Sequence, residues 1–373
     1  MSLSATFDPQ LWARVPFHFW SVTFFVFGCI VGSFLNVCIY RMPIGESVVS
    51  PPSHCPHCRY SIPWFLNVPL FTWLYLQGKC ANCRAPISIR YFLVELLTGL
   101  LFMAAWLDYG HQSALLALVY SLFLAALVVA TFIDLEHFII PDEITIGGMA
   151  VGFVCSFIVP DLHDVSNPGD SLKYGIVGMA FGGGLVYAVL RLGKLAFGRY
   201  RIDLPPASPV IFTETGIVLP NQNIPFEEVF FRDSDAIKLE ASRVELCDRC
   251  YTNVRVSLSR LQLKIGDDLL NPEDVPSMEL VTSQLVMPRE AMGLGDVKFM
   301  AAIGAFLGWQ GVLFSLMASS CIGALTSGIL ILLRRRAWSG LIPYGPYIAL
   351  AAAIWLFGKA QIMVLARIWM GLP

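Results

Sequence analysis

The chain has 373 residues, of which 56% are hydrophobic and only 14% are charged, and its mean hydropathy is +0.65. An average soluble protein carries roughly 25% charged residues, so this composition excludes a disordered chain and argues against a soluble enzyme. The net charge of −2 provides no basic field that would attract nucleic acid. We therefore predict an all-α polytopic membrane protein.

Apolar segments predict about eight transmembrane helices, because each crossing takes about 20 mostly apolar residues. The segments lie near 17–40, 91–108, 113–134, 143–160, 174–195, 297–309, 311–333 and 341–358. With eight crossings, the Lys and Arg clusters in 41–90 and 191–201 and at Arg334–Arg336 fall on one side, which is then predicted to be cytoplasmic. Within the fifth segment, Gly178 and Gly182 are predicted to allow close helix packing.

One region departs from this apolar pattern. Residues 196–290 contain 25 of the 52 charged residues, and Asn253–Leu258 alternates apolar and polar side chains as half-buried strands do. We predict a small β-rich cytoplasmic domain inserted into the membrane body. The predicted organisation is a first helix at 1–40, a cytoplasmic four-cysteine loop at 41–90, helices two to five at 91–195, the insert at 196–290, and helices six to eight at 291–373.

The four-cysteine loop contains two C-x-x-C pairs, Cys55 with Cys58 and Cys80 with Cys83, separated by 21 residues. Two such pairs can present four thiolates in a tetrahedron, which suits a structural Zn²⁺ ion. Thiols on the cytoplasmic side stay reduced, and this favours a metal over disulfides. The alternatives are two redox pairs or incidental cysteines.

A third C-x-x-C pair, Cys247 and Cys250, lies in the insert. A zinc site takes four ligands, and the insert contains no histidine that could complete the set. The pair is therefore predicted to form a local turn with free thiols.

Two aspartates lie at the edges of apolar segments. Asp134 ends the third segment, and Asp296 closes the G-x-G-D sequence that begins at Gly293. Carboxylates at membrane depth are candidates for function, and two adjacent ones can share a proton and act as general base and acid on a peptide. The alternatives are that Asp134 caps a helix and that Asp296 pairs with Lys298. Asp142 reads as a helix start after a proline, and it remains the alternative catalytic acid.

Taken together, these stretches resemble the type IV prepilin peptidase family, the bacterial members of the G-x-G-D aspartyl proteases. The resemblance covers nearly all of the chain outside 196–290, a stretch that is usually short in this family. Its ordered motifs are Gly32–Val37, Arg41–Pro43, the four-cysteine loop, Ile87–Glu95, Asp134, Ile140–Asp142, Gly293–Lys298 and Ile342–Pro346.

The resemblance implies a membrane-embedded hydrolase, an aspartyl endopeptidase that removes short basic leaders from the prepilins or pseudopilins of type IV pilus and type II secretion systems. It maps the two catalytic aspartates onto Asp134 and Asp296, at the cytoplasmic face of the bacterial inner membrane. Many family members also methylate the new N-terminus with S-adenosylmethionine, a cofactor beside the structural zinc. The implied partners are the substrates, the lipid bilayer and pilus or secretion-system assembly proteins, with no nucleic acid.

Two functions of other classes remain open on the residues alone. A transporter would use Asp134 and Asp296 to relay protons or bind a cation, but repeated halves, which are common in transporters, are not evident in the sequence. A non-catalytic membrane scaffold would use the cysteine loop and the insert, and would leave the two aspartates without a role. Loss of peptide cleavage on Asp-to-Asn substitution separates the protease from both.

Overall fold

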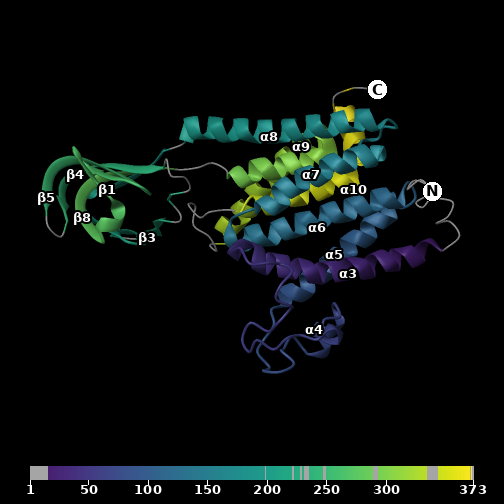
Figure 1. Cartoon of the computed structure of the whole chain (residues 1–373). Coiled ribbons are helices and arrows are strands. Elements are labelled where there is room, and N and C mark those ends of the chain that lie inside the picture. Colours follow the sequence, from purple (N-terminus) through teal and green to yellow (C-terminus); the bar gives the residue numbers. More distant parts are fainter. Residues whose placement is uncertain are drawn as a thin grey trace. The chain divides into compact units, whose positions relative to one another are not determined.

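A computed structural model of the chain describes residues 16–197, 199–220, 222–226, 229–230, 235–246, 249–288, 293–333, 343–369 and 371. The chain divides into a helical unit, Met1–Tyr187 with Leu294–Pro373, and a sheet unit, Ala188–Gly293 (Figure 1). Cys247, Arg334–Arg336 and Ile342 lie outside the described residues. Each unit is considered by itself.

The helical unit is built from long apolar helices. They are α3 (Phe17–Arg41), α5 (Ile89–Tyr109), α6 (Ala114–His137), α7 (Asp142–Ile158), α8 (Pro168–Phe197, of which the part from Ala188 belongs to the sheet unit), α9 (Leu294–Leu332) and α10 (Gly345–Trp369). Six of these are long and apolar enough to cross a membrane, and α7, with 17 residues, is the exception. The loop between α3 and α5 adds the short helix α4 (Phe71–Tyr75) and the 3-10 turns Met42–Ile44 and Trp64–Leu66, and a further 3-10 turn, Pro160–His163, follows α7.

Local sequence explains where several of these helices begin. The side chain of Ser88 accepts a hydrogen bond from the N–H of Arg90 at the start of α5, and Ser113 caps Leu116 of α6 in the same way. Proline precedes α7 at Pro141, which is compatible with a helix start because its missing N–H would be unpaired there in any case.

Helix α9 changes direction at Gly308, whose φ of 67° and ψ of 179° interrupt the helical backbone. A Cβ atom at Gly182 of α8 would lie 2.4 Å from the carbonyl oxygen of Met300 and 3.2 Å from Cγ2 of Val312. In a straight helix, twelve residues would separate those two positions by about 18 Å. The parts of α9 before and after Gly308 therefore both lie against α8.

The closest approach between these helices is at Gly178 of α8 and Gly304 of α9. A Cβ atom at either glycine would lie 2.1 Å from the carbonyl oxygen of the other. Only residues without a side chain allow this contact, as at other small-residue packing faces in membranes. The prediction of close packing at Gly178 and Gly182 is confirmed.

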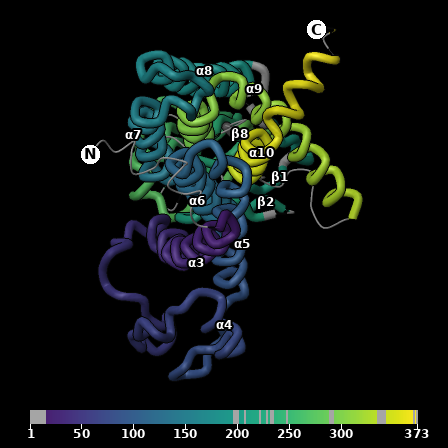
Figure 2. The backbone as a smooth tube through the Cα atoms, turned by 90° about the vertical axis from the view of Figure 1, so that its right-hand side faces the viewer, coloured from purple at the N-terminus to yellow at the C-terminus, as the bar shows by residue number. Residues whose placement is uncertain are grey.

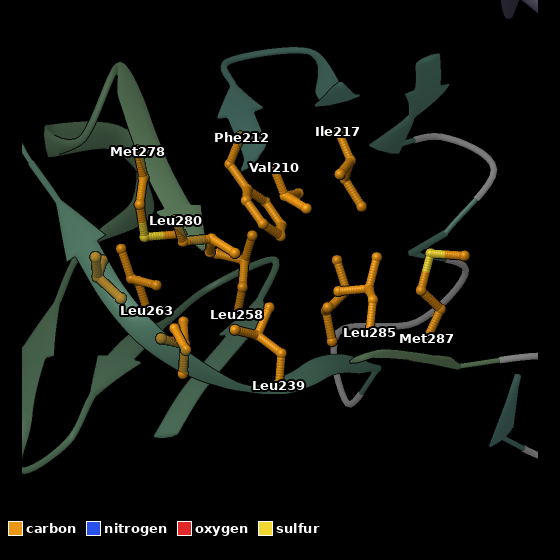
Figure 3. Packing of buried hydrophobic residues seen from close by; sticks show 14 of the residues in the cluster. Val210, Phe212, Ile217, Leu239, Leu258, Leu263, Met278, Leu280, Leu285 and Met287 are labelled. Atoms are coloured by element: carbon orange, nitrogen blue, oxygen red, sulfur yellow. The ribbon is translucent and has the colours of Figure 1, made fainter. Parts of the chain in front are cut away.

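The sheet unit is one antiparallel sheet of eight strands in the order β3-β2-β1-β8-β4-β5-β6-β7. The strands are β1 (Arg199–Thr213), β2 (Gly216–Leu219), β3 (Gln222–Pro225), β4 (Ala236–Glu245), β5 (Cys250–Ser259), β6 (Leu263–Ile265), β7 (Asp268–Leu270) and β8 (Ser277–Pro288). Strands β1 and β8 pair from Arg199 with Pro288 to Thr213 with Ser277. Alternate side chains of β4, among them Ile237 and Leu239, are buried in a core shared with β1, β5 and β8 (Figure 3).

The predicted class, a helical membrane protein with a β-rich region, is confirmed. The sequence placed a boundary near residue 310, between the segments 297–309 and 311–333, and the structure breaks α9 two residues earlier, at Gly308. The total of eight membrane crossings stays a prediction.

Candidate active site and metal centre

Asp134 lies in the last turn of α6, and only 5% of its surface is exposed. Its Oδ2 accepts a hydrogen bond of 2.8 Å from the backbone N–H of Gly345, the first residue of α10. The first N–H groups of a helix have no partner inside that helix, so they are available to an anionic group. The start of α10 thus fixes the orientation of the Asp134 carboxylate.

Asp296 lies in the first turn of α9 and is 8% exposed. Ile140, in the connection between α6 and α7, relates it to Asp134. A Cβ atom at Gly295 would lie 3.5 Å from Cβ of Ile140, and one at Gly345 would lie 3.1 Å from Cδ1 of the same residue. The neighbours of both aspartates therefore contact Ile140, so the structure brings Asp134 and Asp296 to the same end of the helical unit.

The first turns of α7 and α9 are joined by an ion pair. The Nζ atom of Lys298 lies 2.7 Å and 2.9 Å from the two carboxylate oxygens of Asp142. The sequence suggested Lys298 as a partner for Asp296, and the structure pairs it with Asp142. Asp142 begins α7, as its position after Pro141 predicts.

The four predicted metal ligands lie in two turns of the same conformation. In each turn the N–H of the first cysteine donates to the carbonyl five residues later: Cys55 to Tyr60, and Cys80 to Ala85. The residue after the second cysteine, Arg59 or Arg84, donates back to the first and has a positive φ, 54° and 60° respectively. These turns direct all four side chains to one point.

The geometry of the sulfur atoms fits a tetrahedral metal ion. Sγ of Cys55 lies 3.8 Å from that of Cys83, Sγ of Cys58 lies 4.0 Å from that of Cys80, and all four lie within 4.8 Å of one another. A Zn–S bond of about 2.3 Å places thiolates about 3.8 Å apart in a regular tetrahedron. The side-chain amide of Asn82 approaches Sγ of Cys58 at 3.7 Å, as a supporting donor would.

The thiol pKa values favour a cation at this point. The backbone N–H of Tyr60 lowers the pKa of Cys58 to about 6, and the backbone of Cys83 lowers that of Cys80. The backbone of Ala85 acts in the same direction on Cys83, but burial and the neighbouring thiols outweigh it and raise that pKa to about 11. Thiolates this close repel one another, and a bound cation would remove that repulsion.

Comparison with known proteins agrees with the resemblance indicated by the sequence motifs. The family model of the bacterial peptidase A24 N-terminal domain matches residues 26–109, and that of the type IV leader peptidase family matches 121–200 and 277–328. A prepilin leader peptidase/N-methyltransferase of Dichelobacter nodosus is 35% identical over 206 residues, and the alignment covers 47% of this chain and 68% of the relative.

The chain belongs to the type IV leader peptidase family. Relatives with the same printed name are 47% identical over 138 residues in Myxococcus xanthus and 29% identical over 368 residues in Aeromonas hydrophila. The first alignment covers 37% of this chain and 40% of the relative, and the second covers 91% of each. No solved structure matches the chain.

The matches to these two family models leave 201–276 unmatched, and most of the sheet unit lies in that gap. The first match covers α3, the four-cysteine loop and α5, and the second covers both aspartates. The residues shared with this family therefore lie mainly in the helical unit.

Sequence reasoning missed three contacts around the aspartates. The N–H of Gly345 was not assigned to Asp134, Lys298 was not assigned to Asp142, and Arg90 was not assigned to Glu136, with which it forms an ion pair at the last turn of α6. Gly345 lies in the motif Ile342–Pro346, which supports the family resemblance. The sequence therefore marked this residue but did not show its contact with Asp134. The two ion pairs join residues 46 and 156 positions apart, and local patterns carry no information on such pairs.

Substitution Gly345→Ala is expected to lower peptide cleavage. A methyl group there would lie 2.8 Å from Oδ2 of Asp134 and would displace the carboxylate. Displacement of a reacting group by about 1 Å lowers turnover by about 100-fold. Gly147→Ala is the control, because nothing lies within 4 Å of its added methyl group. Cleavage of a prepilin-like substrate in membranes measures both, and full activity of Gly345→Ala would contradict the role given to this contact.

The Asp142→Asn and Lys298→Met variants are expected to keep cleavage within about tenfold of wild type, because an exposed ion pair contributes only about 0.2–1 kcal/mol. The double exchange Asp142→Lys with Lys298→Asp is expected to recover more activity than either reversal alone. If Asp142 were instead a catalytic acid, Asp142→Asn would lose about 10²- to 10⁴-fold in rate. Single-turnover cleavage rates decide between the two.

Purified protein is expected to contain about one Zn²⁺ per chain, held by four thiolates. Cys58→Ser removes one thiolate and is expected to lose most of the metal. Cys321→Ser, at an exposed cysteine of α9 outside the cluster, is the control and is expected to retain it. Elemental analysis by mass spectrometry measures the content, and a metal-free wild-type protein would contradict the assignment.

Proposed function

We propose that the protein is a membrane-embedded aspartyl endopeptidase in which Asp134 and Asp296 are the catalytic pair. The observation that carries this proposal is the burial of both carboxylates at one end of the helical unit, around Ile140. Family membership supplies the substrate class, since the curated relatives are named prepilin leader peptidase/N-methyltransferase. The reaction is removal of the short basic leader from type IV prepilins and pseudopilins.

The chemistry follows from two carboxyl groups that share one proton. The ionised carboxylate takes a proton from a water molecule, which attacks the scissile carbonyl carbon. The protonated carboxyl group donates a hydrogen bond to the carbonyl oxygen as negative charge develops there. When the tetrahedral intermediate collapses, the leaving amine receives the proton that the first group took up.

Contacts within the chain hold the helix ends that carry both groups. The N–H of Gly345 holds Oδ2 of Asp134, so one oxygen of that carboxylate is fixed and the other is left to face the reaction. Asp296 belongs to the first turn of α9, and Lys298, two residues further on, pairs with Asp142 at the start of α7. A fixed separation between the catalytic groups is what such preorganisation provides.

The membrane topology that fits this function has eight crossings. Gly308 divides α9 into two segments that both lie against α8, and α7 is a short crossing of 17 residues. In the helical unit, the described basic residues at the helix ends on the aspartates' side include Arg41 at the end of α3 and Arg90 at the start of α5. Because Lys and Arg favour the cytoplasmic side, we place the active site at the cytoplasmic face of the bacterial inner membrane.

The metal at the four cysteines has a structural role in this proposal. Four thiolates close a tetrahedral shell and leave no position open for a substrate or for water. The ion therefore takes no part in the peptidase step. It holds the two cysteine turns together.

A second activity, N-methylation of the cleaved product with S-adenosylmethionine as methyl donor, is supported by the names of the relatives. The described strands all pair antiparallel, and the sequence contains no glycine-rich turn after a strand of the kind that binds nucleotides in parallel sheets. We assign no residue to this step. Pilus or secretion-system proteins are further proposed partners, again without assigned residues.

The Asp134→Asn and Asp296→Asn variants are expected each to lose about 10²- to 10⁴-fold in cleavage rate, because asparagine keeps the shape but cannot exchange a proton. The measurement is cleavage of a prepilin-like substrate by the full chain in membranes, with wild type beside both variants. Zinc content and membrane extraction show that each variant is folded and inserted.

Retained cleavage in Asp134→Asn would move the catalytic role toward Asp142. If wild type cleaves no such substrate, the peptidase proposal fails, and a transporter or a scaffold becomes the better hypothesis for the function of the protein. Cleavage lost in both variants, with normal insertion, supports the pair.

A further inference from the structure

The loop between α3 and α5 turns its large apolar side chains outward. Over residues 46–88, all of which the structure describes, the only buried residues are Cys55, Gly78 and Cys80. Five large side chains are widely exposed and are together called the aromatic surface here. They are Trp64 (84% exposed), Phe65 (57%), Phe71 (66%), Leu74 (57%) and Tyr75 (72%).

Helix α4 organises the larger part of the aromatic surface. Phe71, Leu74 and Tyr75 are spaced i, i+3 and i+4, so they share one helix face, and the rings of Phe71 and Tyr75 stack at 6.1 Å. Trp73 faces the other way. Its ring lies 5.3 Å from that of Phe92 of α5, and its Nε1 donates to the carbonyl of Ile87. One face of α4 is thus held by α5, and the opposite face is left open.

Helix α4 lies beside α5 and not beyond its end. The N–H of Leu70, which precedes α4, donates to Oε2 of Glu95 at 2.7 Å. Glu95 is six residues inside α5, which is about 9 Å along the axis, with its side chain directed back toward the helix start. Figure 1 and Figure 2 both show α4 to the side of α3 and α5. Since α5 is long and apolar enough to cross a membrane, the aromatic surface lies near the membrane boundary.

The charge of this loop matches one kind of partner. The sequence contains no acidic residue between Glu46 and Glu95, whereas Arg59, Lys79 and Arg84 are basic. Trp, Tyr and Phe together with Lys and Arg are typical of segments at the membrane–water boundary, and the cytoplasmic leaflet carries negative charge. A basic leader peptide would be repelled by the same residues.

We propose that the aromatic surface is an interfacial membrane anchor. It inserts between the headgroups of an anionic leaflet, so the four-cysteine loop lies on the bilayer beside α5 with its basic residues at the phosphates. The anchor is a property of the loop and does not depend on the peptidase reaction, so it can be tested apart from the proposed function.

Hydroxyl-radical footprinting of the full chain in nanodiscs tests the anchor without any substrate. We expect Trp64, Phe71 and Tyr75 to be protected in nanodiscs with anionic lipid. Their oxidation rates should be about tenfold lower than the rates expected from their exposed fractions in the protein without lipid. Leu261 and Leu269 of the sheet unit, exposed to 64% and 62%, are the internal control and calibrate the rate for open side chains. Oxidation of the three aromatic residues at the rate their exposure gives would overturn the proposal.

Two further outcomes separate the alternatives. Protection that begins only when a prepilin-like substrate is added would assign the surface to that protein partner and overturn the lipid anchor. Protection that is equal in zwitterionic and anionic nanodiscs would overturn the role of the basic residues. A weakening of about threefold in zwitterionic lipid supports that role.

A matched pair of variants provides a second measurement. Phe71→Ser with Tyr75→Ser is expected to release the loop, so that trypsin cleaves at Arg59, Lys79 and Arg84 about tenfold faster in nanodiscs than in wild type. Leu261→Ser with Leu269→Ser removes equally exposed apolar side chains and is expected to leave that rate unchanged. Retained zinc shows that the loop is folded, and an unchanged rate in the first variant with full zinc would contradict the anchor.

Discussion

Backbone hydrogen bonding in hydrocarbon is the constraint on which the helical unit depends. No water is available there, so every N–H and C=O group inside a crossing must be paired within a helix. Only the ends of the helices keep free donors, and the N–H of Gly345 at the start of α10 is one of them. That donor binds Asp134, which is itself the kind of group that is costly at membrane depth. The helix end supplies a hydrogen-bond donor to the carboxylate, and the carboxylate supplies an acceptor to the unpaired N–H group.

The same constraint explains why the candidate site is assembled from helix ends. Asp134 comes from the last turn of α6, Asp142 from the start of α7 and Asp296 from the start of α9. Close packing of α8 on α9 through Gly178 and Gly304 holds α9 at the depth that brings its first turn to Ile140. Packing on α7, where Gly152 lies against Ala305 and Phe306, holds the same part of α9 from another side.

Local patterns in the sequence were sufficient for features that depend on neighbours along the chain. The apolar segments, the alternation in the insert, the turns of the two C-x-x-C pairs and the break in α9 near residue 310 all belong to this class. The contacts of Asp134 with Gly345 and of Lys298 with Asp142 do not, because they join residues 211 and 156 positions apart. The packing of the helices determines such partners. The residues next to a carboxylate in the sequence do not indicate which other helix will lie against it.

The four-cysteine loop shows what a fold needs when it lacks an apolar core. Over residues 46–88 its buried residues are two cysteines and a glycine, and of its aromatic side chains Trp64, Phe65, Phe71 and Tyr75 are widely exposed. A soluble domain of this size would gain too little from burial to fold by itself. A metal held by four thiolates can supply that energy from within, and lipid can cover the outer face. On this reasoning the metal stabilises the loop from inside and the membrane covers its outer face. The hydrogen bond from the N–H of Leu70 to Glu95 of α5 fixes the position of the loop along α5.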